Sequence, residues 1–165
     1  MFIKSFIKKS ISIDLKNGDG ETPLMISLMY LNYTSSIETV KFLLENGANI
    51  NLQDRSGNTS LILALRDIYL YFYEIYDEHC FLKHFIVSSF EIMELLLENG
   101  ADPNIQNKSG YTVLMIASIK KKPLKIIKLL IENGANPDLK NKDGKTAFDL
   151  ASTDECKNLI KSYMN

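Results

Sequence analysis

Residues 95–118 read LLLENGADPNIQNKSGYTVLMIAS, and this stretch decides the fold. An apolar run ends in Glu-Asn-Gly-Ala, and a second apolar run begins after Gly-x-Thr-x-Leu. Glycine after an apolar run is typical of a helix end, because left-handed backbone geometry costs glycine little. Threonine before an apolar run is typical of a helix start, because its side-chain oxygen accepts a hydrogen bond from an exposed backbone N–H. The stretch therefore predicts a helix end, an extended Asx-rich turn and a new helix.

Both halves of this stretch recur along the chain and explain seven of its eight glycines. The Gly-x-Thr motif occurs at Gly20, Gly57, Gly110 and Gly144, and the Glu-Asn-Gly-Ala motif at Gly47, Gly100 and Gly134. Between the last two complete units both motifs step by 34 residues. That step is close to the period of roughly 33 residues that one class of repeat protein shows. The recurrence predicts an array of repeated two-helix units.

In these motifs and in its period the chain resembles the ankyrin-repeat family. The resemblance covers nearly every residue outside one insertion. It implies an all-α fold, an α-solenoid: an ankyrin repeat array of helix-turn-helix units with projecting β-hairpin or loop fingers. The chain departs from the family in that only its first unit keeps the proline after the threonine, at Pro23. The family's usual histidine is replaced by Met25, Ile62, Met115 or Asp149, so its usual hydrogen-bond network is not expected here.

The same motifs predict how each unit packs. We expect a threonine to cap each inner helix, at Thr22, Thr59, Thr112 and Thr146. A small residue lies three positions after the first large apolar residue of each inner helix, at Ser27, Ala64, Ala117 and Ala151. Small residues there let neighbouring helices approach closely while larger side chains fill the core.

We expect one ankyrin-repeat domain over residues 1–165. Its expected parts are an N-terminal half-repeat cap at 1–18, a repeat at 19–51, a repeat at 56–104 with an insertion at about 67–86, a repeat at 109–138 and a C-terminal capping repeat at 143–165. In the half-repeat, residues 2–7 would supply an outer helix without its own inner helix. The end repeats would need a polar outer face.

The second unit is longer than the others. Gly57 to Gly100 spans 43 residues, whereas Gly110 to Gly134 spans 24. Apolar residues in the extra stretch recur every three or four positions, which predicts two amphipathic helices that turn near residues 77–79. Tyr69, Tyr73 and Tyr76 form a second stripe there. These tyrosines either contact a partner or shield the flanks of adjacent units.

Composition excludes several functions. The chain has 19 Lys plus Arg against 20 Asp plus Glu, with a net charge of -1, so it lacks the basic surface that nucleic acid or an anionic membrane needs. Its start lacks the pattern of a signal peptide, and its two cysteines suggest neither a disulfide framework nor a zinc module. We therefore expect an intracellular, cytoplasmic monomer without nucleic acid, membrane, metal or cofactor. Its AT-biased composition resembles that of ankyrin proteins from large DNA viruses, which would place it in host cytoplasm.

For function, the resemblance implies a non-catalytic protein-protein interaction module that binds an unidentified protein. The family binds through a concave surface of finger tips and inner helices. The matching positions here are Asp19, Glu21, Tyr30, Arg55, Ser56, Asn58, Arg66, Lys108, Tyr111, Ile119, Lys120, Lys142 and Lys145, joined by the inserted Tyr69, Tyr73 and Tyr76. Their charges change from acidic in the first unit to basic in the last two, which predicts an oriented, salt-sensitive contact. The alternative is that finger residues are polar only because they are exposed.

Other functions stay open as alternatives. An enzyme or metal site would have to use the inserted Asp77, His79, Cys80 and His84, but the two histidines are five residues apart, off the i, i+4 face of a helical ligand pair. The chain could instead be a passive paralogue or a substrate of asparagine hydroxylation at Asn51 and Asn104, whose context looks like that of hydroxylated ankyrin asparagines. Their simpler role is to brace the turn.

A cluster of lysines between the third unit's two helices adds one further candidate contact for an acidic partner. Its members are Lys120, Lys121, Lys122, Lys125 and Lys128. Most such runs are a solvated turn and helix face.

Overall fold

The computed structural model describes residues 12–30, 37–70, 81–120 and 122–164, and the side chains at 66–70 and 81–89 lie outside this description. Within these ranges the chain forms eight helices and no strand. The helices are α2 (Pro23–Met29), α3 (Ile37–Glu45), α4 (Ser60–Leu70), α5 (Phe81–Glu98), α6 (Val113–Ile119), α7 (Leu124–Glu132), α8 (Ala147–Leu150) and α9 (Asp154–Lys161). The expected all-α class is confirmed. The expected outer helix at residues 2–7 lies outside the described residues.

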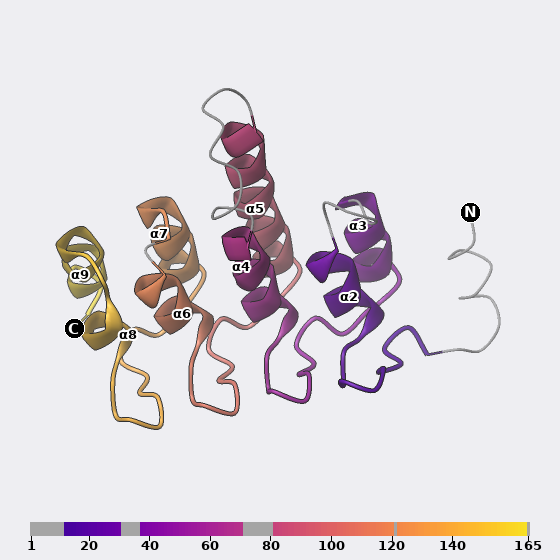
Figure 1. Ribbon diagram of the computed structural model, residues 1–165, viewed down its shortest axis with the longest axis horizontal. Helices are drawn as coiled ribbons and strands as arrows, with labels where there is room; N and C mark the ends of the chain where they lie inside the picture. Colours follow the sequence, from indigo (N-terminus) through magenta and orange to yellow (C-terminus); the bar gives the residue numbers. More distant parts are fainter. Residues whose placement is uncertain (1–11, 31–36, 71–80, 121, 165) are drawn as a thin grey trace.

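The helices form four antiparallel pairs that stack side by side (Figure 1). The inner helices α2, α4, α6 and α8 contact one another in chain order, and each packs on the outer helix that follows it. The loops before the inner helices all project from the same side of the stack (Figure 1). Because the described fingers contain no strand, they are loops rather than β-hairpins.

Each inner helix begins at the threonine that the sequence predicted. The Oγ1 atoms of the four threonines accept the backbone N–H three residues later, at 3.3 to 3.4 Å. Where the family's histidine would stand, the first and last units complete the cap differently. The Met25 sulfur accepts the Thr22 N–H at 3.4 Å, and the Asp149 carboxylate accepts both the N–H and the hydroxyl of Thr146 at 2.8 Å. The position thus still serves the cap without an imidazole.

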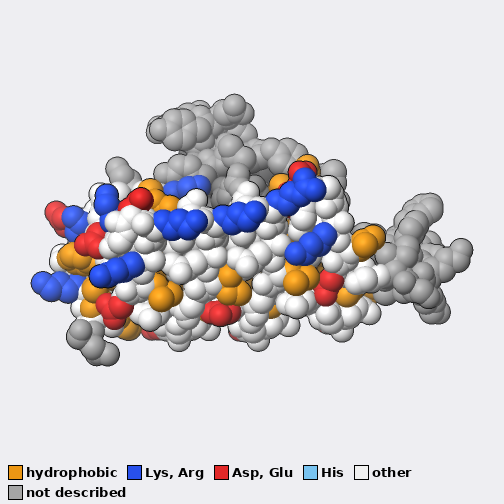
Figure 2. Space-filling view, turned by 90° about the horizontal axis from the view of Figure 1, so that it is seen from below, with side chains coloured by type: hydrophobic (Ala, Val, Ile, Leu, Met, Phe, Trp, Pro, Cys, Tyr) orange, Lys and Arg blue, Asp and Glu red, His pale blue; other side chains and the backbone are white. Residues whose placement is uncertain are grey.

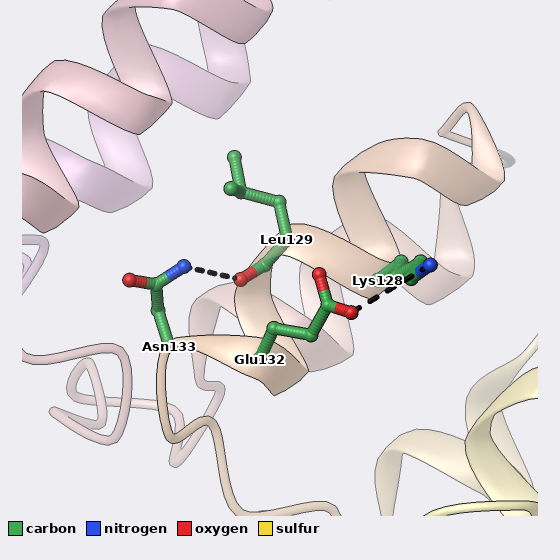
Figure 3. Close-up of polar contacts among 4 residues, drawn as sticks. All are labelled: Lys128, Leu129, Glu132 and Asn133. Atoms are coloured by element: carbon green, nitrogen blue, oxygen red, sulfur yellow. Dashed lines mark hydrogen bonds and ion pairs between the residues drawn. The ribbon is translucent and has the colours of Figure 1, made fainter.

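The outer helices of the first three pairs end at the predicted glycines. Gly47, Gly100 and Gly134 have φ angles of +83°, +86° and +85°. The alanine after each glycine donates its N–H to the carbonyl five residues back, at 3.0 Å. An asparagine precedes each glycine and donates its side-chain N–H to the carbonyl four residues back, as Asn133 does to Leu129 (Figure 3). These bonds satisfy carbonyls that a helix end leaves unpaired.

The core is built from the same positions in successive units. Leu24, Leu61 and Leu114 occupy one buried column of the inner layer, and Val40, Met93 and Ile127 occupy one of the outer layer. The four small residues expected between inner helices, Ser27, Ala64, Ala117 and Ala151, are all buried. A continuous core through all four pairs makes each unit depend on its neighbours.

The helices of the second pair are the longest. Helix α4 has 11 residues and α5 has 18, whereas α2 and α6 have 7 each and α3 and α7 have 9 each. In Figure 1, α5 extends beyond the outer helices on either side. The expected turn at residues 77–79 lies outside the described residues. Among the described helices, none combines the length and apolar character needed to cross a membrane.

Candidate functional site

The candidate site is the surface formed by the finger tips and the ends of the inner helices, which we call the finger–helix surface. Its described members are Asp19, Glu21, Tyr30, Arg55, Ser56, Lys108, Tyr111, Ile119, Lys120, Lys142 and Lys145. They come from all four units, so the stack determines how they lie relative to one another.

One Asx residue shapes each finger. Asn17, Asp54, Asn107 and Asn141 each accept two backbone N–H groups with Oδ1, from the residues two and four positions later, at 2.8 to 3.0 Å. The backbone also closes each loop, as where the Asp54 N–H donates to the Asn58 carbonyl at 3.0 Å. Short Asx side chains favour such turns because they mimic a backbone turn. Each finger is therefore held by its own hydrogen bonds.

Neighbouring fingers are joined through their tips. The N–H of Arg55 donates to the carbonyl of Asp19 at 2.9 Å, and the N–H of Lys108 donates to the carbonyl of Ser56 at 3.0 Å. The N–H of Lys142 makes the same bond to Ser109 at 3.5 Å. The tips are thus fixed to one another by backbone rather than by flexible side chains.

Two glutamines, which sequence reasoning missed, add a second set of links. Gln53 Nε2 donates to the carbonyl of its own finger's Gly57 at 2.6 Å and to the carbonyl of Gln106 in the next finger at 3.0 Å. Gln106 repeats this pattern with Gly110 at 2.6 Å and Lys140 at 2.8 Å. The only sequence signal was glutamine at the same position in two units.

The exposed members of the surface are mainly charged. Asp19, Arg55, Lys108, Lys142 and Lys145 are exposed, as is Ser56, whereas Glu21, Tyr111 and Lys120 are half-buried. Two large apolar side chains accompany them. Tyr30 is 48% exposed at the end of α2, and Ile119 is 40% exposed at the end of α6.

Asn58 is placed differently from the other candidates. Its side chain is only 5% exposed. Its Nδ2 donates to Asp54 Oδ2 at 3.1 Å, and its Oδ1 accepts from Asn107 Nδ2 at 3.2 Å. Asn58 therefore joins two fingers and is not part of the finger–helix surface.

Several sequence candidates lie outside the described residues. The backbone of Arg66 and Tyr69 belongs to α4, but their side chains are not described, and Tyr73 and Tyr76 fall wholly outside. The same holds for Asp77, His79, Cys80 and the His84 side chain. Within the described ranges, no group of three or more His, Cys, Asp or Glu side chains is arranged to hold a metal ion.

Asn51 and Asn104 brace the junctions between units. Asn51 Nδ2 donates to the Gly100 carbonyl at 3.0 Å, and its Oδ1 accepts the Asp102 N–H at 2.9 Å. Asn104 bonds in the same way to Gly134, at 2.8 Å, and to Asn136, at 2.7 Å. The nitrogen and the oxygen of each side-chain amide therefore both make hydrogen bonds. Bracing of this kind is the structural role that the sequence favoured for Asn51 and Asn104.

Among the residues that the structure describes, three titratable groups depart from their ordinary pKa. Burial and, to a lesser extent, the nearby Lys120 charge lower the pKa of Lys122 to about 7. Hydrogen bonds from the backbone and side chain of Thr146 lower the pKa of Asp149. Burial raises the pKa of the Cys156 thiol, which lies in the core.

The lysine cluster is thus not one solvated face. Lys122 is only 6% exposed, so the expectation of a solvated turn is wrong for this residue. Lys125 and Lys128 on α7 are exposed. The Lys128 ammonium lies 3.6 Å from the Glu132 carboxylate on the same helix (Figure 3).

Comparisons with known proteins agree with this architecture. Family models described as ankyrin repeats match residues 2–75, 56–108 and 89–151. One ankyrin repeat protein of Acanthamoeba polyphaga mimivirus is 39% identical over 102 residues, which are 62% of this chain and 19% of that protein. A second mimivirus ankyrin repeat protein is 37% identical over 103 residues, 62% of this chain and 16% of that protein. One from Fowlpox virus is 45% identical over 60 residues, 36% of this chain and 29% of that protein. The chain thus spans less than a third of each of these relatives.

Proposed function

The chain belongs to the ankyrin-repeat family, and on that premise we propose that it is a non-catalytic, intracellular protein-binding module whose partner contacts the finger–helix surface. Ankyrin repeats are generally protein-interaction modules. The proposal goes further, because it names the surface of this chain that the partner contacts.

The observation that carries the proposal is the exposure of Tyr30 and Ile119 at the C-terminal ends of inner helices that begin at the charged fingers. Few large apolar residues are exposed in the described part of the chain, and these two lie at matching ends of inner helices in the first and third units. Interfaces combine apolar or aromatic anchors with a polar rim, and the anchors supply most of the binding energy. Tyr30 and Ile119 would be the anchors here.

The charges of the fingers support an oriented contact. The first finger carries Asp19 and Glu21, and the last carries Lys142 and Lys145. A partner with the opposite charge order would be attracted in one direction along the stack and repelled in the other. Complementary charges of this kind raise association rates and fix register more than they raise affinity.

A second contact surface is the extended part of the second unit. Helices α4 and α5 extend beyond their counterparts in the other units, and the chain between them contains Tyr73 and Tyr76. An insertion in a repeat often lies on a binding face. This surface would bind in addition to the fingers or in place of them.

The experiment compares two double variants with matched exposure. Tyr30→Gln with Ile119→Gln removes the anchors, and Tyr163→Gln with Leu124→Gln removes a tyrosine and a leucine of about the same exposure near the outer helices, 40% and 41%. A chain that lacks residues 67–86 tests the insertion. Each chain is checked by circular dichroism and then used for affinity capture with mass spectrometry.

The proposal predicts that a partner captured by the unaltered chain is lost with the first double variant and kept with the second. Loss only with the shortened chain would place the contact on the insertion. Equal capture by all folded variants would contradict both surfaces.

A further inference from the structure

Three successive finger tips each carry a basic residue at the same position. Arg55, Lys108 and Lys142 directly follow the Asx residue that opens each finger, and all three are exposed. We call them the tip row. Figure 2, which looks onto the finger side of the molecule, shows Lys and Arg side chains spaced along this face. In the described part of the chain the tip row takes part in no ion pair, because the one pair there joins Lys128 and Glu132.

The spacing of the tip row is fixed by backbone. Each tip N–H is bonded to the carbonyl of the preceding finger. The fingers also approach so closely that a Cβ atom at Gly57 would lie 2.6 Å from the Lys108 nitrogen, and one at Gly110 would lie 2.7 Å from the Lys142 nitrogen. The three cations therefore project from a rigid, regularly stepped edge rather than from independent loops.

The expected spacing between neighbouring tips matches the length of three residues in an extended chain. Packed helices lie about 8–10 Å apart, which sets the rise from one unit to the next. An extended strand rises about 3.3 Å per residue, and a polyproline II helix about 3.1 Å with three residues per turn. Every third residue of such a chain would therefore meet one tip, and in polyproline II these residues share one face.

We propose that the partner contributes an extended acidic segment, with a carboxylate at every third residue, that lies along the tip row. This inference rests on the proposed function and specifies the partner's chemistry. In the middle of the row, Arg55 and Lys108 are each followed by an exposed serine rather than by a carboxylate. The Asp54 carboxylate before Arg55 accepts hydrogen bonds within its own finger. Asp143 follows Lys142, but Lys145 keeps that finger positive. Asp19 would repel an acidic segment beyond Arg55, so the segment would end there.

The test measures binding of a fluorescent peptide that repeats Glu-Pro-Ser, by anisotropy at low and high salt. The control peptide has the same composition with its glutamates in one block. One protein variant carries Arg55→Gln, Lys108→Gln and Lys142→Gln. The matched variant carries Lys41→Gln, Lys128→Gln and Lys161→Gln, which removes three exposed charges from outer helices. Thermal unfolding checks that both variants fold.

We expect the periodic peptide to bind about fivefold more tightly than the block peptide, and to lose affinity as salt rises. The tip-row variant should weaken its binding about tenfold, and the outer-helix variant less than about twofold. Equal binding of both peptides, equal loss in both variants, or no binding of either peptide would overturn the inference.

Failure of this inference is distinguishable from failure of the proposed function. If the peptides fail but capture still depends on Tyr30 and Ile119, the finger–helix surface binds a partner of other chemistry. If the periodic peptide binds the tip row but capture does not depend on Tyr30 and Ile119, the proposed function fails while the inference about the tip row stands.

Discussion

Ser60 is a buried residue whose hydroxyl has no hydrogen-bond partner among the described residues. It occupies the first position of α4, where the other inner helices have Pro23, Val113 and Ala147. A buried polar group without a partner costs about 1–3 kcal/mol. We expect Ser60→Ala to raise the free energy of unfolding by about 1 kcal/mol in urea denaturation.

The neighbouring threonine is the control for this change. Thr59 is also buried, but its Oγ1 accepts the Ile62 N–H. Thr59→Ala should lower the free energy of unfolding by about 1 kcal/mol, because it removes a helix cap. If both alanine variants were destabilised equally, Ser60 would have a partner that this account lacks.

The lowered pKa of Lys122 makes the stability of the fold depend on pH. Its pKa is about 7 in the folded chain, against the ordinary lysine value of 10.5 in the unfolded chain. Between these values the unfolded chain binds one more proton, so stability rises with pH in this range. We expect the free energy of unfolding of the unaltered chain to rise by about 2 kcal/mol between pH 7 and pH 9 relative to Lys122→Met. Parallel pH profiles for the two chains would contradict burial of the amine.

Single residues show what the sequence could and could not predict. The capping threonines were predictable because the cap needs only local backbone and one side-chain oxygen. The burial of Lys122 was not predictable. Lys122 lies in a run of lysines, and the sequence of such a run does not show which amine faces the core. The burial of Asn58 depends on contact with Asn107, 49 residues away, which no local pattern reveals.

Among the structural elements, the fingers depend most on glycine. Gly57 has a φ of +81°, and a Cβ there would also meet the Lys108 backbone at 2.6 Å. Gly134 has a φ of +85°, but nothing lies within 4 Å of the corresponding Cβ position. Alanine at either site strains the backbone, at a cost of about 1–2 kcal/mol, and only at Gly57 does it also push two fingers apart.

We therefore expect Gly134→Ala to lower the free energy of unfolding by about 1 kcal/mol and Gly57→Ala by about 3 kcal/mol. Gly18→Ala is the neutral control, since its φ is not in the left-handed region and its Cβ position is open. Chemical denaturation measures all three. A smaller loss at Gly57 than at Gly134 would show that the fingers separate without cost.

The sequence predicted the helices because the inner helices carry a start signal, the first three outer helices carry an end signal, and both have a regular apolar pattern. It also indicated the longer helices of the second unit from the same periodicity. The links through Gln53 and Gln106 were not predicted, because they depend on the distance between fingers that are 53 and 34 residues apart in sequence.

The molecule as a whole is held together unit by unit. Asn104, the last residue of the second unit, joins it to the third through two hydrogen bonds, to the Gly134 carbonyl and from the Asn136 N–H. Asn104→Ala should lower the free energy of unfolding by about 2 kcal/mol, since it removes both bonds. Hydrogen exchange should show the extra opening in α6 to α9, the helices beyond this junction. Uniform loss of protection across all four units would indicate that the stack unfolds only as one body.

The array itself was predictable because its period is visible in the glycines. The proposed binding surface was less predictable from the sequence. The net charge of -1 gives no sign of the three basic finger tips, which form no ion pair with described residues. Only the stacking of the units shows that these tips form a row. The exposure of Ile119 also depends on neighbouring units. Within the sequence it is one more apolar residue at the end of an apolar helix.

Photo-crosslinking from two positions of about equal exposure tests whether a partner contacts the finger–helix surface. Benzoylphenylalanine replaces Ile119 on the inner helix α6 in one chain and Leu124 on the outer helix α7 in the other; the two native side chains are 40% and 41% exposed. We expect the first chain to form a crosslinked protein adduct in cells and the second chain to form none. Adducts from position 124 alone would contradict this expectation.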